Sequence, residues 1–168
     1  MSCLPRLCRL LLIATIAHSL AACAGYSPND RMLGNSQDQI TRAMGKPSIE
    51  IPTPEGRVMQ YPRGPFGKHT YFVYLDQNDN VARWTQVLNE KNFDRIKPGM
   101  HRDEVISIIG ESRVRDGIAF GRGYVWSWRY VNFHCNWFRA EFTPDHVVRS
   151  TMYQKPPECR VRAVSAGR

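Results

Sequence analysis

The residues that can do chemistry are few and widely spaced. Beyond the first 23 residues the histidines are His69, His101, His134 and His146. No two of them stand at the spacing that a helix or hairpin uses to hold a metal ion. His134 adjoins Cys135, but a single dipeptide does not make a ligand set. The sequence therefore predicts no metal site.

Two adjacent carboxylates, Asp103 and Glu104, look at first like an acid–base pair. Consecutive helical residues diverge by about 100° around the helix axis, so the two side chains would not converge on one substrate atom. Carboxylates in a first helical turn instead stabilise the positive end of the helix dipole. The chain also has no Gly-x-Ser-x-Gly motif, and Gly121-Arg122-Gly123 precedes no predicted helix. We expect no enzymatic activity and no cofactor.

A short amphipathic helix is predicted over about 101–109. Pro98-Gly99 has the composition of a turn just before it. Val105, Ile108 and Ile109 stand at i, i+3 and i+4, which places them on one helix face. Gly110 supplies a left-handed C-terminal cap. A helix this short must bury its apolar face against other elements.

The same pattern occurs earlier in the chain, between Gly34 and Gly45. These residues align with Gly99 to Gly110 at a constant offset of 65 (99 − 34 and 110 − 45). Three apolar positions match, with Ile40, Ala43 and Met44 standing where Val105, Ile108 and Ile109 stand. Ser36 and Gln39 form a capping box in the first copy, whereas His101 is a poorer cap in the second. The recurrence predicts an internal duplication.

Strand-like segments follow each helix. In the first half they cover 57–61, 69–75 and 81–88, and in the second half 124–130, 137–142 and 147–153, with short extended pieces at 48–52 and 111–115. Tyr124, Trp126, Trp128 and Tyr130 alternate on one strand face. We predict an α+β fold of two repeats, 33–88 and 89–155, each a helix followed by a three-strand antiparallel meander. The short helices would pack on one face of the sheet, and 156–168 would form a C-terminal tail.

The N-terminus has the pattern of an export signal. Arg6 and Arg9 precede an apolar run at 10–17, and Leu20-Ala21-Ala22-Cys23 resembles a bacterial lipobox. This predicts a signal peptide over 1–22, acylation of Cys23 with palmitate-type chains, and a flexible tether over 23–32. Ala24 after the cysteine fits the outer membrane. The other interpretation is an ordinary signal peptide that contains a cysteine.

The cysteines and the charge fit an exported chain. Of five cysteines, Cys3 and Cys8 lie in the predicted signal and Cys23 at the lipidation position. Cys135 and Cys159 remain, and in an oxidising compartment we predict a disulfide between them, the alternative being two free thiols. The formal net charge of +8 falls to +6 without Arg6 and Arg9. Export argues against nucleic acid as the partner of this basic surface.

The duplicated stretch resembles the SmpA/OmlA family of outer-membrane lipoproteins, also called BamE-like. The likeness rests on Gly99-Met100, on the acidic residue before Val105, and on Gly45-Lys46-Pro47 after the first helix. It implies a periplasmic domain lipid-anchored in the outer membrane, acting without catalysis as an accessory or scaffold in β-barrel protein assembly or envelope integrity. The partners implied are assembly-machinery subunits or other envelope proteins, with anionic phospholipid as a further candidate. As a tandem, the fold also resembles the β-lactamase inhibitor protein architecture.

Two groups of residues are candidates for contacting a partner. The resemblance points to the segment before the second helix, with Phe93, Arg95 and Lys97, although Arg95 and Lys97 also fit a solvated basic turn. The aromatic strand supplies Trp126, Trp128, Arg129 and Tyr130. Its aromatic face is either core or an exposed contact surface. If exposed, a concave sheet lined by these rings would favour the alternative function, an inhibitor or a protein- or ligand-binding module.

Overall fold

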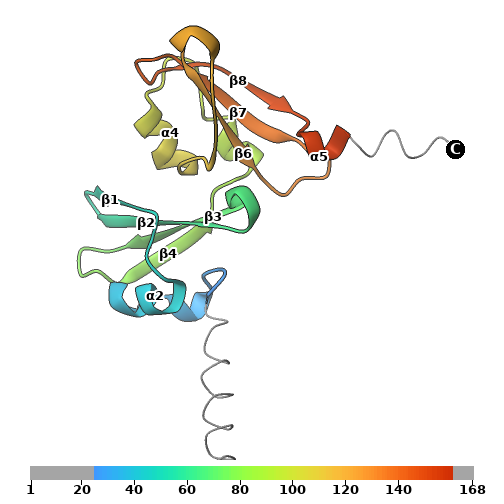
Figure 1. Ribbon diagram of the computed structural model, residues 1–168. Coiled ribbons are helices and arrows are strands. Elements are labelled where there is room, and N and C mark those ends of the chain that lie inside the picture. The colour runs from blue at the N-terminus through green and yellow to red at the C-terminus, as the bar shows by residue number, and fades with distance from the viewer. Residues whose placement is uncertain (1–24, 161–168) are drawn as a thin grey trace, which may run out of the picture.

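The structure is a computed structural model that describes residues 25–160, apart from the side chains of 157 and 160 (Figure 1). The predicted signal peptide, Cys23 and residues 161–168 of the predicted tail lie outside the described residues. The described chain is α+β, with two units that each combine a short helix with a four-stranded antiparallel sheet.

The first unit contains the sheet β1-β2-β3-β4, whose strands are neighbours in chain order. Its helices are η2 (Asp30–Met32), α2 (Gln37–Met44) and η3 (Pro65–Gly67), and its strands are β1 (Ile49–Thr53), β2 (Gly56–Arg63), β3 (His69–Leu75) and β4 (Val81–Gln86). The predicted helix over 36–44 is confirmed as α2.

The second unit repeats this order as the sheet β5-β6-β7-β8. Its helices are α3 (Glu90–Phe93), α4 (Arg102–Ile109), η4 (Ala119–Gly121) and α5 (Pro157–Arg160), and its strands are β5 (Val114–Gly117), β6 (Tyr124–Arg129), β7 (Trp137–Phe142) and β8 (Val148–Gln154). The predicted helix over 101–109 is confirmed as α4.

Each sheet has four strands, so the prediction of three strands per repeat is wrong. The missing strands are the two short extended pieces, which pair along the sheet edges as β1 and β5. A two-residue turn at Pro54-Glu55 folds β1 back onto β2, and Pro52 within β1 is tolerated because β1 is an edge strand. Short polar segments such as β5 lack the apolar alternation that reveals a strand.

The two sheets share their register, which is compatible with the predicted duplication. Met59 pairs with Val73 between β2 and β3, and Trp126 pairs with Ala140 between β6 and β7, an offset of 67 in both strands (126 − 59 and 140 − 73). At the same offset, β3 and β7 each carry a register shift, between Tyr74 and Leu75 and between Glu141 and Phe142. The turn residues that follow, Asp79 and His146, both have positive φ, 58° and 66°.

Capping residues set both helix starts. The Ser36 backbone N–H donates to Oε1 of Gln39 at 2.8 Å, so the Gln39 side chain reaches back to the cap residue as the predicted capping box requires. His101 caps better than predicted, since its Nδ1 accepts from the Asp103 N–H at 3.3 Å and its own N–H donates to Glu104 at 2.7 Å. The second helix therefore also begins with a capping box, built from His and Glu.

The elements stack in four layers, α2, the first sheet, α4 and the second sheet (Figure 1). Ile40 and Met44 of α2 pack with Met59, Tyr61 and Val73 on one face of the first sheet. The other face of that sheet turns toward α4. The first sheet is thus covered on both faces, by its own helix and by the helix of the next unit.

Helix α4 joins the two units into one core. Val105 and Ile109 are fully buried in a cluster that takes Val58 and Phe72 from the first sheet as well as the aromatic residues of the second. The buried Gln60 side chain donates its Nε2–H to the carbonyl of Ile106 at 3.0 Å, across the two units. The helix is therefore an internal layer of the protein.

The two C-terminal caps of the helices provide a matched test of this packing. Gly45 and Gly110 have the same backbone conformation (φ 79°, ψ −175° and φ 78°, ψ 171°), a region that strains any side chain by about 1–3 kcal/mol. A Cβ at Gly45 would meet nothing within 4 Å, whereas at Gly110 it would lie 3.0 Å from Cγ2 of Thr70 and 3.3 Å from Oε1 of Gln60.

We expect Gly110→Ala to lower the free energy of unfolding by more than Gly45→Ala, by about 1–3 kcal/mol for the overpacked contact. Urea unfolding of the full mature chain measures both. Equal losses in the two variants would mean that the first sheet does not press on the end of α4.

Candidate functional site

The aromatic strand is core, which corrects its proposed use as a contact surface. Trp126, Trp128 and Tyr130 are 3%, 2% and 7% exposed. They face α4, and the Trp128 indole N–H donates to the carbonyl of Gly110 at 3.0 Å, at the end of that helix. Side chains buried to this extent do not line a concave binding sheet. The alternative function that depended on them therefore loses its surface.

Phe93 is also core, so its assignment to a partner-binding edge is wrong. It is 1% exposed, and its ring stacks on Phe138 with centroids 4.5 Å apart and planes 7° apart. It also meets Tyr130 edge-on at 4.9 Å. Helix α3 thus closes one end of the aromatic core. Arg95 and Lys97 lie in exposed positions beyond it, where their role as partner contacts stays a prediction.

The open surface of the second sheet is its other face. A groove with a volume of about 340 Å³ lies there, and we call it the outer groove. It is lined by residues of β5, β6, β7 and β8 and of the segment after β8: Val114, Asp116, Ser127, Trp137, Arg139, Gln154, Lys155 and Pro156. Apolar walls around a few converging polar groups are typical of binding sites.

Arg139 is the central polar group of the outer groove. Its Nε–H donates to Oγ of Ser127 at 3.1 Å, and its terminal nitrogen donates to the Gln154 amide oxygen. Asp116 lies 3.8 Å away and is largely exposed, so this ion pair is loose. The guanidinium is thereby held between β6 and β8, beside the exposed carboxylate of Asp116.

The matching face of the first sheet shows why this face is open. At the offset of 67 that relates the two sheets, Arg139 and Glu141 of β7 occupy the positions of Phe72 and Tyr74 of β3. Phe72 is buried under α4, whereas Arg139 and Glu141 are only half-buried, and Phe66 of η3 contacts Trp137 at the start of β7. Charged residues therefore stand where the second unit faces solvent, as in the terminal repeat of an array.

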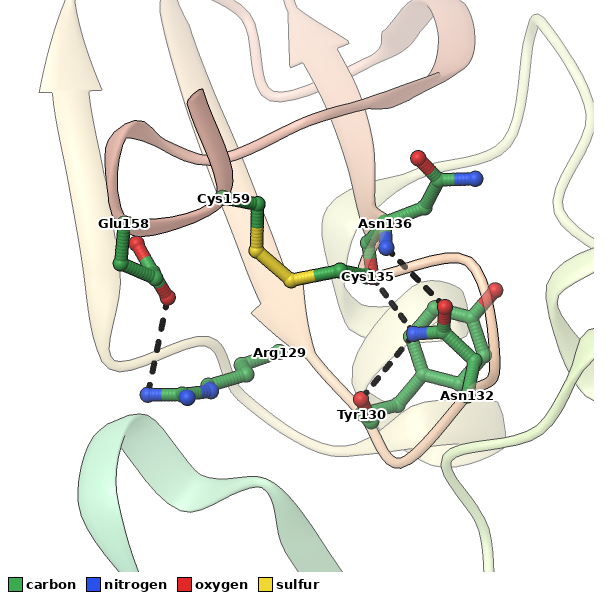
Figure 2. Close-up of a disulfide and its surroundings, with 7 residues drawn as sticks. All are labelled: Arg129, Tyr130, Asn132, Cys135, Asn136, Glu158 and Cys159. Atoms are coloured by element: carbon green, nitrogen blue, oxygen red, sulfur yellow. Dashed lines mark hydrogen bonds and ion pairs between the residues drawn. A yellow bond between two sulfur atoms is a disulfide. The ribbon is translucent and has the colours of Figure 1, made fainter. Parts of the chain in front are cut away.

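A disulfide joins two segments that flank the outer groove in the chain, and its prediction is confirmed. Cys135, in the loop between β6 and β7, is bonded to Cys159 on α5, with Cα atoms 6.4 Å apart (Figure 2). Arg129 and Glu158 form an ion pair of 3.6 Å beside it. The bond fixes α5 next to Pro156, which is buried and forms part of the groove wall.

The sequence contained part of the signal for this site. The alternation that turns Phe138, Ala140 and Phe142 inward necessarily turns Trp137 and Arg139 outward. The aromatic residues dominate the alternation along the strand, so the sequence alone gives no separate indication of a site on its polar face. Over residues 25–160 the structure has no group of three or more His, Cys, Asp or Glu placed to hold a metal ion. Within the same range, no helix has the length and apolar character to cross a membrane.

Comparisons with known proteins leave the family of the chain unassigned. No family model matches it, and no curated protein matches it. Among solved structures the chain is similar to an extracellular protein containing an SCP domain from Bacillus anthracis str. Ames, with 13% identity and a TM-score of 0.32. The match covers 82% of this chain and 48% of that one, so the chain spans about half of that protein's length. A likeness at this TM-score carries no argument about fold or function.

The disulfide should contribute substantially to stability. Cross-linking residues 24 apart restricts the unfolded chain, which stabilises the fold by about 3 kcal/mol in the entropic description. We expect the double variant Cys135→Ser/Cys159→Ser to lose roughly this amount in urea unfolding. Glu158→Gln, which removes only the neighbouring half-exposed ion pair, should lose less than about 1 kcal/mol. Comparable losses in the two variants would contradict this role of the bond.

Tyr130 should make the protein sensitive to alkali. Burial, and then the hydrogen bond from its hydroxyl to Glu90 (3.1 Å), raise the pKa of Tyr130 above the usual value near 10. The folded state therefore favours the neutral phenol, and its stability falls as the pH rises above about 10, where the unfolded chain ionises. We expect Tyr130→Phe to lose less unfolding free energy between pH 9 and pH 11 than the wild type. Identical pH profiles would show that Tyr130 ionises freely in the fold.

Proposed function

We propose that this protein is a non-enzymatic lipoprotein, anchored in the outer membrane through Cys23, with its domain in the periplasm. It serves there as an accessory or scaffold in outer-membrane β-barrel assembly or envelope integrity. The observation that carries the proposal is the repeated unit, in which a capped helix of eight residues packs on an antiparallel sheet. This is the layout that the resemblance to the BamE-like family implies. The lipobox-like Leu20-Ala21-Ala22-Cys23 adds the anchor.

A scaffold needs rigid, exposed contact surfaces, and two surfaces with basic residues are candidates in the described chain. The outer groove presents Arg139 and Lys155 on the open face of the second sheet. The turn before α4 presents Arg95 and Lys97 between the units. Because α4 fixes the units to each other, both surfaces keep a constant relative position. Anchoring raises the effective concentration of such surfaces beside membrane partners.

The anchor is tested by mass analysis of the mature N-terminus and by membrane fractionation. We expect an acylated Cys23 and outer-membrane recovery, both lost in Cys23→Ala. A mature N-terminus without acyl chains would remove the lipoprotein assignment, whatever the partner.

The partner surface is tested by crosslinked pull-down from membranes. Lys155→Glu reverses an exposed charge at the outer groove, and Lys46→Glu reverses an exposed charge in the first unit as a matched control. We expect the wild type and Lys46→Glu to recover barrel-assembly subunits or other envelope proteins, and Lys155→Glu to recover several-fold less. Recovery of one periplasmic enzyme with altered kinetics would favour the inhibitor function instead.

A further inference from the structure

We propose that the domain lies directly on the bilayer along one apolar edge, and that Phe133 inserts its ring among the acyl chains. We call this set the apolar edge: Tyr26, Phe66, Val131 and Phe133. Their exposed fractions are 49%, 51%, 66% and 100%. The inference rests on the proposed anchor at Cys23 and adds the orientation of the domain to it.

The proposed anchor residue is only a short length of chain away from the folded domain. Cys23 precedes Gly25 by two residues, which span at most about 7 Å. Gly25 already packs against α2, where an added Cβ would lie 2.2 Å from the carbonyl oxygen of Ala43. Tyr26 follows, with its hydroxyl 2.7 Å from Nδ1 of His69. The expected tether over 23–32 thus includes residues that contact the first unit, and an acylated Cys23 would hold this side of the domain at the membrane surface.

Contacts lead from this side to the second unit. His69 begins β3 directly after η3, which carries Phe66. The Phe66 ring lies 5.6 Å from the Trp137 ring, and the Arg129 guanidinium lies 5.6 Å from the Phe66 centroid. Trp137 begins β7 immediately after the loop that holds Phe133. In Figure 1 this loop and η3 lie toward the right of the view, and the described chain starts below them, beside α2.

The loop holds Phe133 outward on a braced backbone. The Asn132 side chain donates to the carbonyl of Asn136 at 2.7 Å and accepts from its N–H at 3.0 Å (Figure 2). Cys135 ties the loop to α5. Residues 130–136 contain no acidic side chain. A fully exposed ring on such a loop loses little conformational entropy when it enters an apolar phase.

The repeat explains why this ring is free. At the shared offset, Phe133 corresponds to Phe66 (133 − 66 = 67), and Phe66 is half covered by Trp137 and Arg129 of the following unit. The described chain has no third unit to cover Phe133. A bilayer held beside the domain by the anchor provides the missing apolar phase.

Phe120 provides a matched control. It is 94% exposed, but it lies on η4, before β6, whereas Phe133 lies in the loop after β6. The two rings therefore stand at opposite ends of one strand. An orientation that inserts Phe133 lifts Phe120 away from the membrane.

The test places the photoreactive residue p-benzoyl-phenylalanine at position 133 or at position 120 of the full, acylated protein. Both sites are exposed, so both variants should unfold at the wild-type urea midpoint. After reconstitution in phosphatidylcholine vesicles and irradiation, we expect at least tenfold more lipid adduct from position 133 than from position 120. A zwitterionic lipid without net charge is used because the inference concerns acyl chains and not net headgroup charge.

Two results would overturn the inference. Equal adduct yields from the two positions, or no lipid adduct at position 133, would show that the edge does not face the bilayer. In intact envelopes, a protein adduct at position 133 without a lipid adduct would assign the loop to a protein partner. The mass of the N-terminal peptide is read in the same samples. An unacylated Cys23 refutes the proposed function itself, whereas an acylated Cys23 with no lipid adduct refutes only this orientation.

Discussion

The burial of α4 between two sheets is the constraint on which the arrangement of this protein depends. A helix of eight residues does not form alone in water. Here Val105 and Ile109 are fully buried in a core that both units supply. The buried Gln60 amide donates to the helix backbone, and Gly110 leaves room for Thr70 where the helix ends. The units are therefore parts of one packed body, and surfaces on different units keep fixed positions.

Local patterns in the sequence predict the helices and their repetition well. Caps, apolar spacing and terminal glycines act within one or two turns, so they leave a readable signature. The contact of α4 with the first sheet is harder to predict, because Val58 and Phe72 can equally belong to the core of their own unit, and the rest of the contact is a glycine, a backbone carbonyl and the polar Gln60. None of these residue types identifies α4 as their partner. The edge strands β1 and β5 were missed for a similar reason, since they are short and without strict alternation.

The unpredicted contact between α4 and the first sheet also affects the prediction of the candidate site on the aromatic strand. If one short helix covered each sheet, some of Tyr124, Trp126, Trp128 and Tyr130 would stay exposed. The structure adds Phe93 from α3 and Phe72 from the first sheet to the same core, and these close over the rings. The sequence therefore allows both interpretations of the strand, as core or as contact surface. Tertiary packing buries its aromatic face in the core. The candidate site in the structure is instead on the opposite face of the second sheet, where Arg139 lies.

Comparison of the two units explains where this protein can meet other molecules. Both faces of the first sheet pack inside the protein, with Phe72 and Tyr74 turned toward α4. In the second sheet Arg139 and Glu141 take those positions, which makes the face unsuitable for another apolar helix. Stacking of a further apolar unit on this face is therefore disfavoured. The features available for interaction are those in which the two described units differ: a groove with a hydrogen-bonded arginine, and a disulfide-braced loop whose phenylalanine is fully exposed.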